Sequence, residues 1–278
     1  MTDARRGAAL LLGSLTAVGA LSWAVGTVGV VPAAATVPAA AAPVVPGYVA
    51  SALADPARPP EQLALDAARR PAELLAFAGV KPGDRVGDFM AGGAYFTRLF
   101  SRIVGADGHV YAFLPEEQLK NCAPAETAGA RALAGDAAYA NVTVLVAPAA
   151  QFHPPELLDV VWTSLNFHDL YDSFMGPADV PQVARSLAAA LKPGGVLIVV
   201  DHAAQAGSGV RDTETRHRID PQVILRTFEA GGLHFEAQSD LLRNRADNHE
   251  LRVFDPAIRG HTDQVILKFR KPPQRPIA

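Results

Sequence analysis

The segment 86–97 constrains the fold of this chain more than any other stretch. It reads as a short apolar strand, a turn of small residues and the start of a helix. Asp88 lies at the end of the strand, and Gly92 and Gly93 lie in the turn. Glycine at such a turn lets the backbone approach a ligand closely, and an acidic side chain at the strand end can accept hydrogen bonds from ligand hydroxyl or ammonium groups. The same layout also occurs as an ordinary tight turn in an α/β domain, so the rest of the chain decides between the two interpretations.

The chain around this segment alternates between strands and helices. The expected strands are 109–113, 142–146, 158–165 and 196–200, with two more after His234 on either side of an irregular loop at roughly 243–261. The expected helices are 95–104, 116–133 with a break near Pro124, 180–191, and one opened by Asp220 and Pro221. Segments 142–146 and 158–165 are nearly continuous apolar runs, as strands covered on both faces of a parallel sheet must be. The alternation therefore predicts a doubly wound α/β sheet in a domain at 61–278.

The first 60 residues have a different composition. Arg5 and Arg6 precede an apolar run at 7–31 that is followed by small residues, which is the layout of a signal peptide. The run is also long enough to span a bilayer, so residues 1–31 are predicted to be a signal peptide or an uncleaved membrane anchor. Residues 32–60 are mostly Ala and Pro with few charges, and they are predicted to form a disordered linker. The domain is therefore expected to be exported, either periplasmic or anchored to the inner membrane facing the periplasm.

Composition excludes several classes of function. The 25 Lys and Arg residues are scattered and are outnumbered by 28 Asp and Glu, so the concentrated basic face of a nucleic-acid-binding protein is not expected. The single cysteine, Cys122, excludes an intramolecular disulfide and a thiolate metal cluster. A membrane is expected to contact the chain only through the N-terminal anchor, and the sequence indicates no oligomeric state.

Three sequence features occur together in an order and spacing that is specific. They are the strand and turn from Asp88 to Thr97, the run Asp159-Val160-Val161, and the run 191–195 (LKPGG) before a strand that ends in Asp201. With them, the domain from about Glu61 to Pro272 resembles the class I S-adenosylmethionine-dependent methyltransferases. The resemblance implies a Rossmann-like, mostly parallel sheet with an antiparallel C-terminal strand, and S-adenosylmethionine as the cofactor.

A narrower resemblance is carried by segments further along the chain. These are 166–169 (NFHD), Asp201-His202 with the glycine-rich 207–209, 217–220 (HRID), and the tail from Phe254-Asp255 to Lys271-Pro272. They are similar to a family of exported bacterial proteins that are predicted to be methyltransferases.

The chain departs from the superfamily pattern at several cofactor positions. The first loop of the superfamily reads acid-x-Gly-x-Gly-x-Gly, whereas here Met90 and Ala94 occupy the outer glycine positions. Met90 is expected to narrow the pocket for the methionine part of the cofactor. The acid expected after the second strand falls on Leu114; Glu116 or Glu117 could replace it, or could be ordinary acidic residues of a helix N-terminus. The cofactor-binding residues that the resemblance implies are Asp88, Met90, Gly92, Gly93, Tyr95, Leu114 and Gln151.

Polar residues follow two neighbouring strands. His168 and Asp169 come after the fourth strand, and Asp201 and His202 come after the fifth, so they are expected to meet at one edge of the sheet. Methyl transfer to a hydroxyl group needs positioning and a base, and histidine titrates near neutral pH. His168 is predicted to be the base, as in the His-Asp pair of small-molecule O-methyltransferases that it resembles; alternatively, it caps the strand end. The predicted catalytic residues are Asn166, His168, Asp169 and His202.

The long polar segment 203–219 is predicted to cover the substrate. Asp201, Arg211, His217 and Arg218 are the predicted substrate-binding residues. Arg211 and Arg218 would hold an anionic group, or would instead form salt bridges to Asp212 or Asp247. Arg69 and Arg70 are likewise either a solvated helix end or anion-binding residues.

A metal site is the main alternative for the histidines. His202, His217 and His249, with His168, Asp169 or Asp201, supply ligands that suit a divalent metal. No pair has the spacing of a zinc-binding helix, so no metal ligands are assigned. The function predicted from the sequence is therefore methyl transfer from S-adenosylmethionine to a small molecule. The alternative is a non-catalytic periplasmic ligand- or metal-binding protein on the same scaffold.

Overall fold

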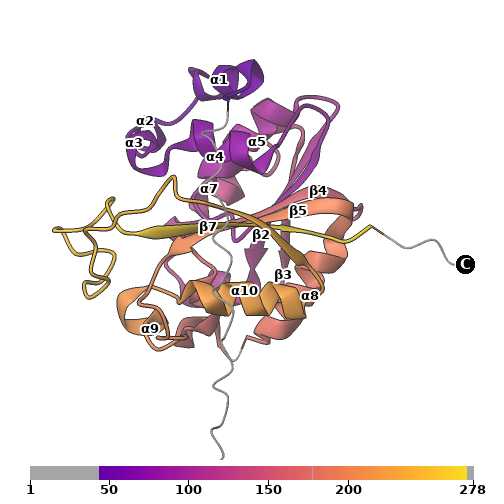
Figure 1. Cartoon of the computed structure of the whole chain (residues 1–278). Helices are drawn as coiled ribbons and strands as arrows, with labels where there is room; N and C mark the ends of the chain where they lie inside the picture. Colours follow the sequence, from indigo (N-terminus) through magenta and orange to yellow (C-terminus); the bar gives the residue numbers. More distant parts are fainter. Residues whose placement is uncertain (1–43, 177, 274–278) are drawn as a thin grey trace, which may run out of the picture. The chain divides into compact units, whose positions relative to one another are not determined.

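A single seven-stranded sheet lies at the centre of the fold (Figure 1). The computed structural model describes residues 44–176 and 178–273. The strands are β1 (Arg85–Phe89), β2 (His109–Pro115), β3 (Val142–Ala147), β4 (Leu158–Ser164), β5 (Leu191–His202), β6 (His234–Ser239) and β7 (Gln264–Arg270). Their order is β3-β2-β1-β4-β5-β7-β6; the first five pair in parallel, and β7 is antiparallel to both neighbours. The prediction of a Rossmann-like sheet with an antiparallel C-terminal strand is confirmed.

Helices cover both faces of this sheet, as the nearly continuous apolar strands require. They are α1 (Gly47–Leu53), α2 (Pro60–Leu63), α3 (Asp66–Arg69), α4 (Pro71–Ala78), α5 (Tyr95–Val104), α6 (Glu116–Asn121), α7 (Pro124–Leu133), α8 (Val180–Ala190), α9 (Thr213–Arg216) and α10 (Pro221–Ala230). Three 3-10 turns are η1 (Ala137–Tyr139), η2 (His168–Tyr171) and η3 (Ser173–Met175). Residues of α1, α4, α5 and α7 form one apolar core, and residues of α8 and α10 form the other.

Local sequence signals set several helix starts. Asp179 and Asp220 cap α8 and α10 by accepting hydrogen bonds from the backbone N–H groups of Gln182 and Gln222. Proline lies in the first turn of α7, α8 and α10, where no intrahelical N–H donor is needed. The break predicted near Pro124 is therefore a new helix start.

The prediction of a disordered linker at 32–60 is wrong for its last part. Residues 47–53 form α1, and Val49 and Ala52 on one face of this helix are buried in the core beside α5. This burial stabilises a helix that is too short to form alone. Residues 32–43 and the predicted signal peptide or anchor at 1–31 lie outside the described residues. Within 44–176 and 178–273, no helix has the length and apolar character needed to cross a membrane.

Candidate functional site

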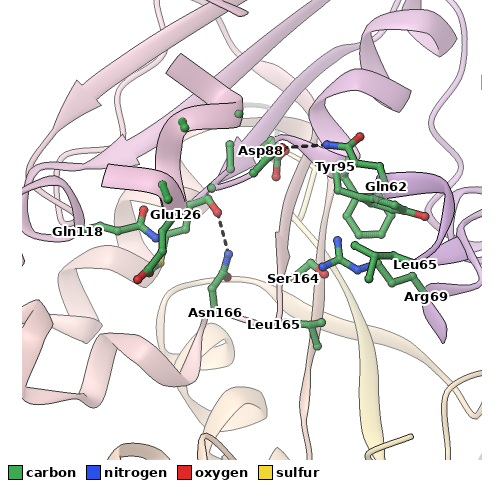
Figure 2. Close-up of a pocket in the computed structure, with 18 of the residues that line it drawn as sticks. Gln62, Leu65, Arg69, Asp88, Tyr95, Gln118, Glu126, Ser164, Leu165 and Asn166 are labelled. Carbon is green, nitrogen blue, oxygen red and sulfur yellow. Dashed lines mark hydrogen bonds between the residues drawn. The ribbon is translucent and has the colours of Figure 1, made fainter. Parts of the chain in front are cut away.

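A cavity of about 620 Å³ opens at the carboxyl ends of β1 and β4 (Figure 2). The strand order reverses between these two strands, which is where ligands bind in open α/β sheets. The lining residues are Glu61, Gln62, Leu65, Arg69, Asp88, Met90, Ala91, Gly92, Gly93, Tyr95, Phe96, Gln118, Ala125, Glu126, Ala128, Gly129, Ser164, Leu165, Asn166 and Asp169.

The turn after β1 keeps a glycine-like backbone although two expected glycines are replaced. Met90 and Ala94 both have φ of 60°, and Gly92 has φ of 49°. These values lie in the left-handed region that glycine favours, so the side chains at 90 and 94 are held there at a cost in backbone strain. Met90 packs in the apolar core with Phe89 and Phe113 and also lines the cavity, so the expectation that its bulk narrows the pocket stays a prediction.

The buried carboxyl group of Asp88 lies at the base of this turn. The Thr97 hydroxyl donates to Asp88 Oδ2 over 2.5 Å. Burial raises the pKa of Asp88 to about 7, and the hydrogen bonds from Thr97 only partly offset this effect. A carboxyl group in this state gains a charge near neutral pH and strongly favours a hydrogen-bond donor or cation beside it.

Side chains from the N-terminal helices cover the turn. Gln62 Nε2 donates to Gly93 O over 2.9 Å (Figure 2), while its Oε1 is buried without a hydrogen-bond partner among the described residues. The guanidinium group of Arg69 lies over the Tyr95 ring, 4.4 Å from the ring centroid, and burial lowers the pKa of Arg69. Within the part of the chain that the structure describes, Arg69 makes no ion pair. Gln118 Oε1, from α6, is a second buried acceptor without a partner in those residues. The cavity is thus lined by hydrogen-bond acceptors without donors and by the cation of Arg69, which has no anionic partner among the described residues.

A cluster of histidines and carboxylates adjoins the other end of the cavity. Asp201 is fully buried; its carboxylate accepts from the His168 backbone N–H over 2.8 Å and lies 2.7 Å from His168 Nδ1. His168 Nε2 lies 3.1 Å from Asp169 Oδ1 and 3.3 Å from His217 Nδ1. Burial alone would lower the pKa of His168, but the charge of Asp201 and the hydrogen bonds of both carboxylates raise it to about 10.

Comparison with known proteins gives relatives in one superfamily. The ubiquinone/menaquinone biosynthesis C-methyltransferase UbiE of Vibrio campbellii is 28% identical over 193 residues, which are 69% of this chain and 63% of that protein. The protein-L-isoaspartate O-methyltransferase of Ignicoccus hospitalis is 27% identical over 128 residues, 46% of this chain and 52% of that protein. The chain thus matches less than two thirds of each relative's length. No family model matches the chain.

Solved structures have the same fold. The S-adenosylmethionine-dependent methyltransferase of Aquifex aeolicus has a TM-score of 0.51 and 16% identity, covering 76% of this chain and 93% of its own. The S-adenosylmethionine-dependent methyltransferase of Mesorhizobium loti has a TM-score of 0.51 and 18% identity, covering 74% and 100%. The chain thus has the fold of the class I S-adenosylmethionine-dependent methyltransferase superfamily, and the sequence relatives named above are methyltransferases. The narrower resemblance to exported proteins stays a prediction.

Of the cofactor residues implied by this superfamily, most but not all reach the cavity. Asp88, Met90, Gly92, Gly93 and Tyr95 line it. In the described part of the chain, Leu114 and Gln151 lie outside the lining; Leu114 is fully buried in the core, and Gln151 is exposed on the surface. The structure therefore does not support these two assignments, because Leu114 packs into the apolar core at the end of β2 and Gln151 lies on the surface after β3.

The two acidic residues considered as replacements for the missing acid are also engaged elsewhere. Glu117 accepts from the Ala149 backbone N–H over 3.0 Å, and Glu116 pairs with Lys120 over 3.0 Å. The neighbouring Gln118 lines the cavity instead. No sequence pattern pointed to Gln118, because the direction of its side chain depends on how α6 packs.

The predicted catalytic residues divide into two groups. Asn166 and Asp169 line the cavity, and Asn166 Nδ2 donates to Met90 O over 2.9 Å (Figure 2). His168 lies between them in the chain, but it does not line the cavity among the described residues. His202 instead pairs with Thr262 Oγ1 over 2.8 Å, and its ring lies 6.0 Å from the His168 ring. Burial lowers the pKa of His202 well below its usual value, and His202 does not line the cavity among the described residues, so the structure does not support its catalytic assignment.

All four predicted substrate residues are involved in internal contacts. Arg218 is fully buried and pairs with Asp247 over 2.8 Å, while Arg211 is exposed and pairs with Asp212 over 3.0 Å. Both arginines thus form the salt bridges that were the alternative interpretation. Asp201 is fully buried against His168 and cannot contact a substrate. Only His217 lies at the outer side of the cluster, with 17% of its side chain exposed.

Helix α7 contributes a residue that sequence reasoning missed. A Cβ atom on Gly129 would lie 2.2 Å from Gly93 O, and the Ala130 N–H donates to Gly92 O over 3.0 Å. Gly129 therefore lets α7 pack directly on the turn that lines the cavity. A glycine inside a helix usually lowers the stability of the helix. Its presence within the predicted helix is the only sequence signal that could have identified Gly129.

Replacing Gly129 by alanine is expected to destabilise the protein, although alanine is normally the better helix residue. The added methyl group must push α7 away from the turn, at a cost of roughly 1–3 kcal/mol in the free energy of unfolding, which urea denaturation measures. Ala132→Ser, at an exposed position of the same helix, is the control and should remain close to wild type. A Gly129→Ala protein that is more stable than wild type would show that α7 and the turn do not need this close contact.

Proposed function

We propose that the protein is a methyltransferase that transfers the methyl group of S-adenosylmethionine to a small molecule. The observation that carries this proposal is the cavity at the β1–β4 reversal, which combines the Asp88 carboxyl, two amide oxygens without donors and the unpaired cation of Arg69 among the described residues. The UbiE relative is named as a C-methyltransferase, and the activity is carried over to this chain as part of the proposal.

The residues around the cavity fit the cofactor chemically. S-adenosylmethionine carries an ammonium group, ribose hydroxyls and an adenine amino group, all of which donate hydrogen bonds. Asp88, Gln62 and Gln118 supply buried acceptors for such donors, and Arg69 supplies a cation for the carboxylate. When bound, the cofactor supplies a methyl group on a sulfonium centre.

We propose that the acceptor molecule binds at the end of the cavity formed by Asn166 and Asp169. Methyl transfer depends mainly on in-line positioning, and these two side chains can orient polar groups of the acceptor. His168 remains the proposed base for a hydroxyl acceptor. Because its pKa is raised to about 10, its neutral form increases as the pH rises toward that value. The exported location likewise remains a proposal, based on the composition of residues 1–31.

Two measurements on the full chain test this function. Calorimetric titration with S-adenosylmethionine is expected to give one site per chain, and absence of binding at millimolar ligand would overturn the proposal. Methyl transfer from labelled cofactor to a protein-free small-molecule extract is expected to rise from pH 7 to pH 9. His168→Ala should keep the cofactor affinity and lose this transfer; transfer that survives the substitution would show that His168 is not the base.

A further inference from the structure

Three side chains point ligand atoms at one common centre beside the cavity. His168 Nε2, Asp169 Oδ1 and His217 Nδ1 are separated by 3.1, 3.3 and 3.7 Å. Zinc binds imidazole nitrogen and carboxylate oxygen at about 2.0–2.2 Å, so neighbouring ligand atoms of a tetrahedral site lie about 3.3–3.5 Å apart. The three separations lie on both sides of this range, so the atoms are already close to three corners of a tetrahedral metal site before any metal is bound.

The surroundings of His168 also match those of a metal ligand. Its Nδ1 lies 2.7 Å from the fully buried Asp201 carboxylate, which also accepts from the His168 backbone N–H over 2.8 Å. A carboxylate on one ring nitrogen fixes the ring and leaves the other nitrogen, here Nε2, as the metal ligand. With Asp201 and Asp169 together, the cluster holds two carboxylates, whose charge a divalent cation would balance.

We propose that His168, Asp169 and His217 form a binding site for a divalent transition-metal ion of the Zn²⁺ class, with Asp201 as the outer partner of His168. Two imidazoles and one carboxylate favour such ions over Mg²⁺ or Ca²⁺, which prefer oxygen ligands. His202 and His249, the other histidines considered from the sequence, are held by Thr262 and Asp263 and take no part. Three protein ligands leave a fourth position open, and Asp169 belongs to both this cluster and the cavity lining.

The proposal does not rest on the methyltransferase function. It concerns binding by the chain itself, which can be measured without S-adenosylmethionine. It does set a condition on that function, because a metal ion on His168 Nε2 would occupy the nitrogen that has to accept a proton. The metal-bound cluster and the proton-accepting cluster are therefore alternative states of the same residues.

One contact in the structure opposes metal binding, so removing it provides a test in which the affinity for the metal should increase. Arg252 Nη2 lies 3.0 Å from His217 Nε2, and a guanidinium group can only donate, so here Nε2 accepts and Nδ1 carries the ring hydrogen. Ligation through Nδ1 requires the other tautomer, for which the exposed Arg252 side chain must move away. Arg252→Ala is therefore expected to tighten metal binding.

The test is calorimetric titration of the untagged, chelator-treated full chain with ZnCl₂, together with Co²⁺ absorption in the visible range. We expect one equivalent of Zn²⁺, Co²⁺ bands typical of tetrahedral coordination, and at least tenfold weaker binding for His217→Ala and Asp169→Asn. Asp201→Asn is expected to weaken binding by about 10–100-fold. His234→Ala, at an exposed position of β6, is the control and should bind like wild type.

Two results would overturn the proposal. The first is the absence of a saturable one-to-one site in wild-type protein. The second is wild-type affinity in both His217→Ala and Asp169→Asn, which would place any bound metal elsewhere. Circular dichroism of each variant separates loss of the site from loss of the fold. Unchanged or weaker binding by Arg252→Ala would contradict ligation through His217 Nδ1.

Discussion

Replacing Asp88 by asparagine is expected to weaken binding of S-adenosylmethionine by about 10–100-fold at pH 8 and by much less at pH 6. At pH 8 the wild-type carboxyl group, with its pKa of about 7, is mostly charged and forms charge-assisted hydrogen bonds with the cofactor, which contribute roughly 1.5–3 kcal/mol. At pH 6 it is mostly protonated and resembles the variant. Calorimetric titration of both proteins at both pH values measures the difference.

The same substitution should change stability in the opposite direction. The pKa of Asp88 is raised in the folded protein from its ordinary value of 3.8 to about 7, so its favourable contribution is present below pH 3.8 and is lost as the pH rises through 7. At pH 8 the charged carboxylate therefore costs up to roughly 4 kcal/mol, and Asp88→Asn should be the more stable protein. Asp107→Asn, at an exposed turn, is the control for both measurements. Equal cofactor affinity of wild type and Asp88→Asn at pH 8 would remove Asp88 from the binding site.

Asp88 could be identified from the sequence because a charged residue at this position is unfavourable for stability and departs from the local pattern. An acidic residue at the end of an apolar strand contradicts the local pattern, and such contradictions concentrate at functional sites. Most of the sheet was readable for a related reason, because most strands are apolar runs with glycine or proline near their ends; β6, which alternates between exposed and half-buried residues, is an exception. Both features are local in the chain.

The residues that sequence reasoning missed depend on contacts between distant segments. Gln62, Gln118 and Gly129 reach the cavity from three different helices, and none of them departs strongly from its local pattern. Helix α1 was missed because its composition is that of a linker, and only burial of Val49 and Ala52 against the core stabilises it. The Met90 and Ala94 positions were recognised as departures, but their left-handed backbone could be seen only in the structure.

Arg218 illustrates the same limit, since its sequence pattern fits a substrate-binding arginine as well as a buried ion pair. Its guanidinium group contacts Asp247 over 2.8 Å and also donates to the backbone oxygens of Ala203 and Leu251, each over 3.1 Å. It therefore joins the end of β5, the segment before α10 and the loop before β7. His217, the outer member of the metal-ligand cluster, precedes it directly in the chain.

Replacing Arg218 by alanine is expected to lower the free energy of unfolding by about 3–5 kcal/mol. The substitution leaves Asp247 as a buried, unpaired charge and leaves the backbone oxygens of Ala203 and Leu251 without this donor. For a domain of this size, the loss corresponds to a fall of roughly 6–20 °C in Tm, measurable by calorimetry or circular dichroism. Arg211→Ala is the matched control, because among the described residues that exposed arginine pairs only with its neighbour Asp212, and its removal should leave Tm unchanged.

A double variant separates the ion pair from other effects of the substitution. If the charge left on Asp247 causes most of the loss, then Arg218→Ala combined with Asp247→Ala should be less destabilised than the sum of the two single variants. A substrate-binding Arg218 would behave differently: the alanine variant would keep its Tm, and the two substitutions would not be coupled in stability. Because Arg218 fixes the position of His217, its loss is also expected to weaken Zn²⁺ binding, whereas Arg211→Ala should leave that affinity unchanged.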